Sequence, residues 1–212
     1  MKSIQHPKEA KAGFSLIELL VVVGIIGLLL TVSVPALSSL RGSGSVNSAV
    51  LNISLILEQA RSYALANNVY VWVGFRQDAS MNPSSLVVTT VSGVTGSAQD
   101  IQSGETFRPV MKLQRFENIA LKTPTGFADM APSASDLNSA GVNISFESGS
   151  SGSGGGTFDR VIQFGPQGGA RIDPASIPRW LQLGLVPTHG NPDNDAAIQV
   201  AGLTGQVRTF RR

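Results

Sequence analysis

The chain has 212 residues, a length that suits one modest domain with an additional anchoring segment. It holds 16 Lys and Arg against 14 Asp and Glu, and beyond residue 13 the two signs balance at 13 each. This balance gives little support to a nucleic-acid-binding protein. The absence of cysteine excludes a disulfide framework, a thiolate nucleophile and a cysteine-ligated zinc site.

A short basic leader precedes an apolar stretch that contains a single acid. The leader, residues 1–13, has a net charge of +2 and ends at Gly13. The apolar stretch begins at Phe14, carries Glu18 at its fifth position, and has no charged residue from 19 to 37, which is long enough to cross a bilayer as a helix. A carboxylate deep in such a helix costs about 2.5–3.5 kcal/mol, and less near the interface. The pattern therefore predicts a partner for Glu18.

Residues 11–20 (KAGFSLIELL) resemble the processing site of type IV prepilins and type II secretion pseudopilins, and Pro35 matches a helix-bending proline of those families. The resemblance implies that a prepilin peptidase cuts between Gly13 and Phe14 and then methylates the new amine of Phe14. Gly13 suits a cleavage site because it lets the backbone extend without a side-chain clash. The basic leader favours a cytoplasmic N-terminus. We therefore expect a single-pass protein of the bacterial inner membrane with its bulk in the periplasm.

Two interpretations of the anchor stay open at this level. In a helical assembly, Glu18 of one subunit would neutralise the Phe14 amine of its neighbour and fix the axial register. Alternatively, Glu18 bonds its own amine or faces the headgroups and the helix N-terminus. Gly24 and Gly27 either allow the helix to unwind locally or permit close helix packing.

A second helical pattern follows a glycine–serine joint at residues 41–45, where we expect a break or a weak joint. Apolar residues then recur at spacings of three and four up to residue 66, and Asn67 with Asn68 predicts the stop. The residues of this stripe are Val46, Val50, Ile53, Leu57, Ala60 and Ala64.

Beyond Asn68 the period changes to two, which predicts a half-buried strand over residues 69–75. Further strands are predicted at 86–91, 110–116, 142–146, 160–164, 181–185, 197–200 and 206–210, and a mobile serine–glycine loop at 148–156. The order of helix and then strands, without crossover helices, predicts an α+β fold in which a long N-terminal hydrophobic helix packs on an antiparallel sheet. The expected division is a leader (1–13), a transmembrane and assembly helix (14–41), and a periplasmic head (42–212).

Three segments of the head narrow the resemblance to minor pseudopilins of the GspH/FimT type. They look like that group's helix-to-sheet junction, its strand with a turn, and its closing hairpin. The segments are residues 57–64 (LEQARSYA), residues 161–168 (VIQFGPQG), and residues 197–200 (AIQV) with 205–208 (GQVR).

Catalytic and metal-binding patterns are not evident in the sequence. Beyond the leader the single histidine is His189. Asp193 and Asp195, with Asn191, are weak candidates for calcium ligands, but the spacing lacks the glycine and the distal glutamate of an EF-hand-like loop, so a solvated turn is favoured. Neither a lysine nor a helix follows the glycine-rich stretch at 152–156 as a phosphate-binding loop requires. We predict a protein that is not an enzyme and needs no cofactor.

Two functions remain as hypotheses. The first is a structural one: a minor pseudopilin of a type II secretion pseudopilus or type IV pilus-like fibre. Its implied partners are the prepilin peptidase, other pseudopilins or pilins, the membrane, and an inner-membrane assembly platform with its ATPase.

The second is a FimT-like minor pilin that binds DNA for uptake through Arg208, Arg211 and Arg212. DNA-binding members of that group carry an arginine directly after the glycine, where this chain has Gln206, and a solvated basic tail is the simpler interpretation. Nucleic acid is therefore not favoured as a partner.

Overall fold

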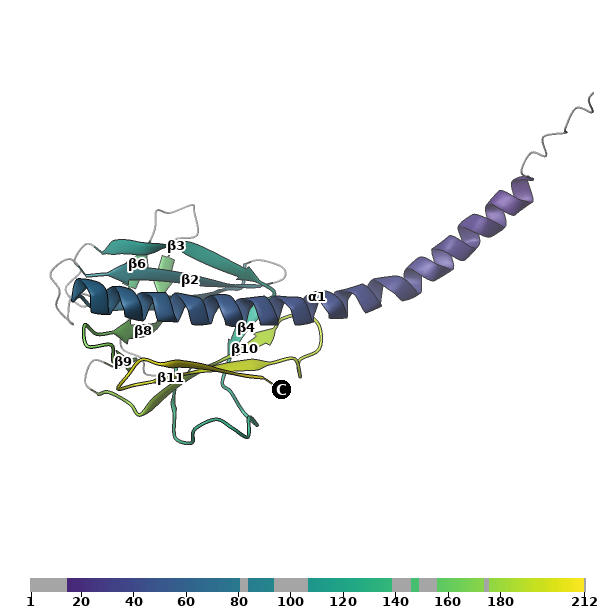
Figure 1. Cartoon of the computed structure of the whole chain (residues 1–212). Coiled ribbons are helices and arrows are strands. Elements are labelled where there is room, and N and C mark those ends of the chain that lie inside the picture. The colour runs from purple at the N-terminus through teal and green to yellow at the C-terminus, as the bar shows by residue number, and fades with distance from the viewer. Residues whose placement is uncertain are drawn as a thin grey trace, which may run out of the picture. The chain divides into compact units, whose positions relative to one another are not determined.

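The computed structural model describes residues 15–80, 84–93, 107–138, 146–148, 156–173 and 176–211, without the side chains of residues 30–44 and 146–148. The chain forms two compact units, one ending at Ser38 and one beginning at Ser39, and each is described by itself. A helix is followed by antiparallel sheets, so the predicted α+β class is confirmed (Figure 1).

Helix α1 spans Leu16–Asn67 and ends where the sequence predicts. Asn68 adopts a left-handed conformation with φ of 54°, and the Val69 N–H donates to the Ala64 carbonyl at 3.2 Å, which is the hydrogen bond of a Schellman-type C-cap. The break expected at residues 41–45 is wrong for the backbone, because α1 continues through them as helix. A glycine in a helix costs only about 1 kcal/mol relative to alanine, which a long helix tolerates.

The predicted apolar stripe of α1 is confirmed as the centre of the head's core. All six of its residues are at most 1% exposed. They pack with inward-facing residues of both sheets, such as Val73, Phe75, Leu183 and Ile198. A helix stripe between two sheets gives the head one continuous hydrophobic core.

The first sheet has the strand order β3-β2-β1-β8-β9. Its strands are β1 (Val71–Asp78), β2 (Ser85–Ser92), β3 (Arg108–Glu117), β8 (Arg160–Phe164) and β9 (Ala170–Arg171), and all their pairings are antiparallel. The second sheet has the order β12-β11-β10-β4, built from β4 (Ile119–Lys122), β10 (Trp180–Pro187), β11 (Ala196–Ala201) and β12 (Val207–Arg211). Figure 1 shows α1 running along both sheets in the head.

Short elements complete the head and depart from the sequence prediction. Strand β5 (Ser135–Asp136) pairs with β10 in parallel, although only antiparallel pairs were expected. Strands β6 (Phe146–Ser148) and β7 (Gly156–Phe158) form a two-stranded sheet, so both ends of the predicted 148–156 loop are strand residues. Residues 149–155, and residues 142–145 of a predicted strand, lie outside the described residues.

Strand β1 is buried on both faces, so the prediction of a half-buried strand is wrong. Val71, Trp72, Val73 and Phe75 are all fully buried. Val73 faces the main core, while Trp72 packs in a second cluster that includes Phe158 of β7. The β7 strand therefore covers the face of β1 that the alternating pattern leaves to solvent.

Gln77, at the end of β1, joins the two sheets. Its amide nitrogen donates to the Ile119 carbonyl at 3.1 Å, and its amide oxygen accepts from the Leu121 N–H at 3.3 Å. Both partners belong to β4 of the second sheet. One side chain thus satisfies two backbone groups where the sheets meet.

Candidate functional site

The predicted processing residues Gly13 and Phe14 lie outside the described residues, which begin at Ser15. Ser15 precedes α1 directly, and its carbonyl accepts from the Glu18 and Leu19 N–H groups at 3.1 and 3.2 Å. Ser15 therefore occupies the N-cap position, and Glu18 falls at the third helical position. Serine followed three residues later by glutamate is the spacing of a capping box, a signal that the sequence carries and that the sequence reasoning missed.

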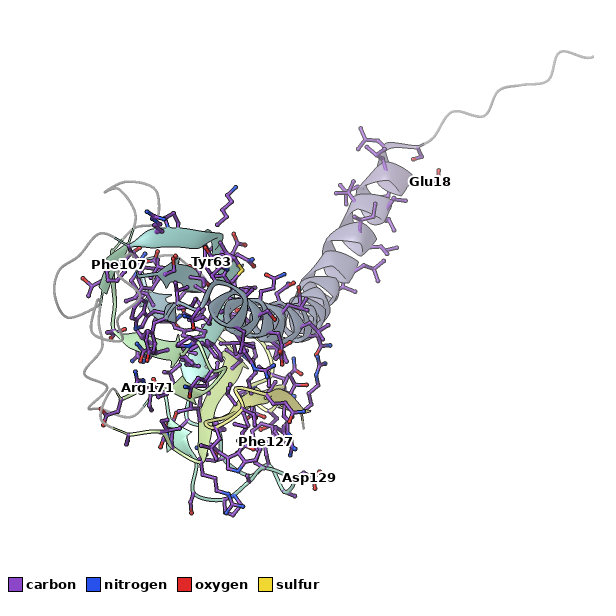
Figure 2. The ribbon with its side chains drawn as sticks, turned by 60° about the vertical axis from the view of Figure 1, so that its left-hand side comes forward. Glu18, Tyr63, Phe107, Phe127, Asp129 and Arg171 are labelled. Carbon is purple, nitrogen blue, oxygen red and sulfur yellow. The ribbon has the colours of Figure 1, made fainter. Side chains whose placement is uncertain are left out.

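Glu18 is an exposed acid in the first turn of α1 (Figure 2). A negative charge at this end of a helix is stabilised by about 0.3–1 kcal/mol through the helix dipole. The interpretation in which Glu18 serves its own helix N-terminus thus has a local geometric basis. Pairing of Glu18 with a neighbouring subunit stays a prediction, and both can hold together because a carboxylate accepts several hydrogen bonds.

The first turns of α1 expose apolar side chains in every direction (Figure 2). Their exposed fractions run from 46% at Val22 to 82% at Leu16. The exposed large residues of this stretch are Leu16, Ile17, Leu19, Leu20, Val21, Val22, Val23, Ile25, Ile26, Leu28 and Leu29. A helix that is apolar on all sides belongs in apolar surroundings. We name residues 16–29 the apolar helix surface.

The apolar helix surface includes two glycines that leave open space. A Cβ atom added at Gly24 or at Gly27 would meet no other atom within 4 Å. Pro35 lies in helical backbone, and its predicted role in assembly stays untested. Among the described residues, no helical segment combines the length and the hydropathy needed to cross a bilayer.

The three head segments that carry the GspH/FimT resemblance meet at one place, which we name the helix–hairpin junction. Glu58 on α1 accepts a hydrogen bond from the Val207 N–H at 3.2 Å, and its carboxylate lies 3.7 Å from Arg61. Gly168 and Gly205 have φ of 83° and 66°, respectively. A Cβ on Gly205 would lie 2.2 Å from the Gly168 carbonyl oxygen and 2.9 Å from Cδ of Arg61. The junction therefore requires glycine at position 205.

The C-terminal arginines have different surroundings. Arg208 lies over the Trp180 ring at 5.1 Å, whereas Arg211 donates from Nη1 to Asn47 Oδ1 on α1. Because side chains of a strand alternate between faces, residues three apart on β12 point to opposite faces of the sheet. Val207 packs against the main core, on the α1 side with Arg211. Arg212 lies outside the described residues.

The weak calcium candidates form a turn with its own internal bonds. Asn191 Oδ1 accepts from the Asp193 N–H at 3.0 Å, and Asp193 is exposed. Asp195 is only 5% exposed and lies 3.8 Å from the Lys122 ammonium. Within the described residues no group of three or more His, Asp or Glu side chains could hold a metal ion. The neighbouring His189 donates its backbone N–H to Asn118 Oδ1 at 2.7 Å.

Among the described residues of the head, the carboxylate of Asp78 has a pKa that is shifted from its ordinary value. The pKa of Asp78 lies below its ordinary value, first because the Ser80 hydroxyl donates to it at 2.6 Å, and further because of the Ser80 N–H and of Arg115 at 3.0 Å. Partial burial works in the opposite direction and is outweighed. The ion pair between Asp78 and Arg115 crosses β2 and links the end of β1 to β3.

Ser80→Ala is expected to raise the pKa of Asp78 and to lower the free energy of unfolding by about 1 kcal/mol at pH 7. Because the folded pKa is depressed, this stabilisation is present above the unfolded pKa of about 3.9 and is lost as pH falls through the folded value. Urea denaturation of the full chain in detergent at pH 7, 5 and 3 measures it. A difference that persists undiminished at pH 3 would contradict the assignment. Asp159→Asn is the control. Because the Asp159 side chain is 62% exposed, its ion pair with Arg160 should contribute little, and the free energy of unfolding should change little.

Comparison with curated proteins gave no match, and comparison with solved structures gave none either. A family model described as the prokaryotic N-terminal methylation motif matches residues 10–34. The matched range includes the predicted cut, Glu18 and the whole apolar helix surface. Residues 10–34 therefore carry the type IV pilin-like prepilin signal, which indicates a pilin-like precursor and implies processing by a prepilin peptidase and assembly with other pilins.

Proposed function

We propose that the chain is a minor pseudopilin, a structural subunit of a type II secretion pseudopilus or a type IV pilus-like fibre, and not an enzyme. The observation that carries this proposal is the coincidence of the methylation motif with a helix that exposes apolar side chains on all sides and has one acid in its first turn. Such a surface is compatible with lipid before assembly and with neighbouring helices afterwards.

The proposed sequence of events begins in the bacterial inner membrane. The lysine-bearing leader stays cytoplasmic, the helix from residue 14 anchors the chain, and the head lies in the periplasm. The prepilin peptidase removes residues 1–13 and methylates the amine of Phe14. An inner-membrane platform with its ATPase then moves the subunit out of the bilayer into the fibre.

Membership of the GspH/FimT type is the finer part of the proposal. It is supported by the helix–hairpin junction, because the segments that carry the resemblance lie far apart in the chain yet touch. Glu58 and Val207 are separated by 149 positions and share a hydrogen bond. A resemblance spread over distant segments is more informative when those segments form one structural unit.

The alternative function, DNA capture for uptake, has less support from the geometry. A phosphate-binding patch needs several cations on one surface. The side chains of Arg208 and Arg211 extend from opposite faces of the sheet. Arg208 already contacts the Trp180 ring, and Arg211 already donates a hydrogen bond to Asn47. We therefore propose the structural role first.

Gly13→Val tests the processing step. A β-branched residue at the cut stiffens and crowds the backbone that must enter the peptidase, so we expect cleavage to fall at least tenfold. Cells that express the chain with a prepilin peptidase provide the assay, and the loss of 13 residues is measured as a gel mobility shift. Ala10→Val places the same side chain three residues upstream as the control and is expected to be cut normally. Normal cleavage of Gly13→Val would contradict the assigned site.

A further inference from the structure

A small cavity of about 150 Å³ opens at the end of the head where the 165–170 turn meets Ile177. Its lining includes Tyr70, Arg171 and Ile177, together with turn residues that include Pro166, the polar Gln167 and Gly169. The cavity is too small for a nucleotide or a typical cofactor, which need about 300 Å³ or more. The size fits one side chain or one chain terminus.

The positive charge beside this cavity is held in place. Arg171 donates from Nε to Gln163 Oε1 at 2.5 Å, and its guanidinium lies 5.6 Å from the centre of the Tyr70 ring. Gln163 is fully buried, and it lies opposite Arg171 in the β8–β9 pair. A guanidinium fixed on two sides loses little further freedom on binding, and its planar donors match a carboxylate.

Two exposed apolar residues lie at or beside the cavity, Ile177 in its lining and Leu203 in a neighbouring loop. Ile177 is 56% exposed and Leu203 is 77% exposed. The loop that contains Ile177 and the loop that contains Leu203 lie side by side, because the Gly202 N–H donates to the Arg179 carbonyl at 3.1 Å. The Leu203 loop also lies against the cavity, since a Cβ on Gly169 would be 3.5 Å from the Leu203 carbonyl oxygen. A small pocket with exposed apolar residues beside it is typical of a protein contact site, in which one anchoring group enters the pocket and the apolar surroundings are covered.

We propose that this cavity, with Arg171, binds a carboxylate borne on a short aliphatic group and supplied by a partner polypeptide. The aliphatic part packs on Tyr70 and Ile177, and the carboxylate meets the guanidinium of Arg171. The carboxylate comes either from an acidic side chain or from a chain terminus. This contact goes beyond the fibre-building role and depends only on residues of the head.

Isovalerate and its neutral isostere isovaleramide test the site directly. The full chain in detergent micelles is titrated with each probe, and the methyl NMR signals of Ile177, Leu203 and Ala170 are followed. Isovalerate is expected to shift these signals saturably at millimolar concentration and to bind at least fivefold more tightly than isovaleramide. Equal affinity for the two probes, or no saturable shift with isovalerate, overturns the proposal.

Two variants assign the preference to this cavity. Arg171→Gln is expected to reduce the isovalerate affinity to that of isovaleramide, and retention of the preference would overturn the proposal. Arg208→Gln is the matched control, since Arg208 also lies over an aromatic ring but outside the cavity, and it should keep the preference. Ile177→Asp, at an exposed position that folding tolerates, supplies a second variant that should weaken isovalerate binding at least fivefold.

Two tetrapeptides then distinguish the source of the carboxylate. Gly-Ala-Ala-Leu with a free C-terminus represents a chain end, and Gly-Ala-Glu-Leu with an amidated C-terminus represents an acidic side chain. Tighter binding by either one, relative to amidated Gly-Ala-Ala-Leu, supports the proposal and identifies the source. If neither binds more tightly than the amidated control, a partner polypeptide is excluded as the ligand.

Discussion

Glu18→Ala is expected to leave the chain inserted and cut but to reduce its incorporation into fibres at least tenfold. The proposed cleavage would create a positive amine at Phe14, four positions before Glu18 in the sequence. Without the carboxylate of a neighbour, that amine enters an apolar environment unpaired, at a cost of about 2.5–3.5 kcal/mol if it lies deep. Each 1.4 kcal/mol corresponds to a factor of ten in an equilibrium constant. Even partial burial is therefore enough for a tenfold effect.

The measurement uses cross-linking at an introduced cysteine. Because the chain has no cysteine of its own, Leu20→Cys in the apolar helix surface reports only this contact. Ser15→Ala is the matched control, since loss of the N-cap costs about 1 kcal/mol of helix stability while Glu18 and its charge remain. Glu18→Ala removes a helix-dipole interaction of similar or smaller size. Normal co-assembly of Glu18→Ala, or an equal loss in Ser15→Ala, would contradict the pairing.

Gly202→Ala is expected to lower the free energy of unfolding of the head by at least about 3 kcal/mol. A Cβ at this position would lie 1.6 Å from the Pro178 carbonyl oxygen and 2.8 Å from its carbon. These are backbone atoms, so no side-chain rotation relieves the clash. The backbone at Gly202 is also held on both sides, by its N–H to Arg179 at 3.1 Å and by its carbonyl, which accepts from Ala170 at 2.7 Å. Overpacking of a constrained site typically costs 1–3 kcal/mol and occasionally more.

Urea denaturation of the full chain in detergent, followed by tryptophan fluorescence, measures this loss. Gly165→Ala is the matched control, because a Cβ there would make ordinary contact with the Tyr70 ring at 3.4 Å and meet no backbone closer than 3.9 Å. Its expected change is below about 1 kcal/mol. Equal stability of Gly202→Ala and the unaltered chain would show that the 176–179 and 202–205 loops are not packed as described.

Local patterns in the sequence predicted the parts of the fold that depend on neighbouring residues. The stop of α1 at Asn67 follows from two asparagines that tolerate the left-handed conformation, and Asn68 adopts it. The strand at 160–164 was predicted at its observed bounds. The longer strands were found within a few residues because each has several alternating apolar positions.

Features that depend on distant residues were not predictable. Strands β5 and β9 have two residues each, too few for any period. The burial of Trp72 depends on Phe158 of β7, a segment whose serine–glycine neighbours favoured a loop. The helix–hairpin junction was present in the sequence as three separate resemblances, but the hydrogen bond from Val207 to Glu58 follows only from the fold.

The candidate functional site divides in the same way. The cut at Gly13 and the role of Glu18 were inferred from a contiguous motif and stay predictions, while the range that contains both residues matches the methylation motif. The sequence did not single out Arg171, because its pairing with Gln163 and its stacking on Tyr70 require the β8–β9 pair and the start of β1 to come together. A lone arginine beside alanine carries no signal of that arrangement.

The intact mass of the chain, purified from membranes that contain an active prepilin peptidase, tests the central claim most directly. The account predicts a protein that lacks residues 1–13 and carries one added methyl group, with fragmentation placing that group on the amine of Phe14. A chain that keeps all of its first 13 residues under these conditions, while a known pilin in the same membranes is cut, would contradict the proposed function.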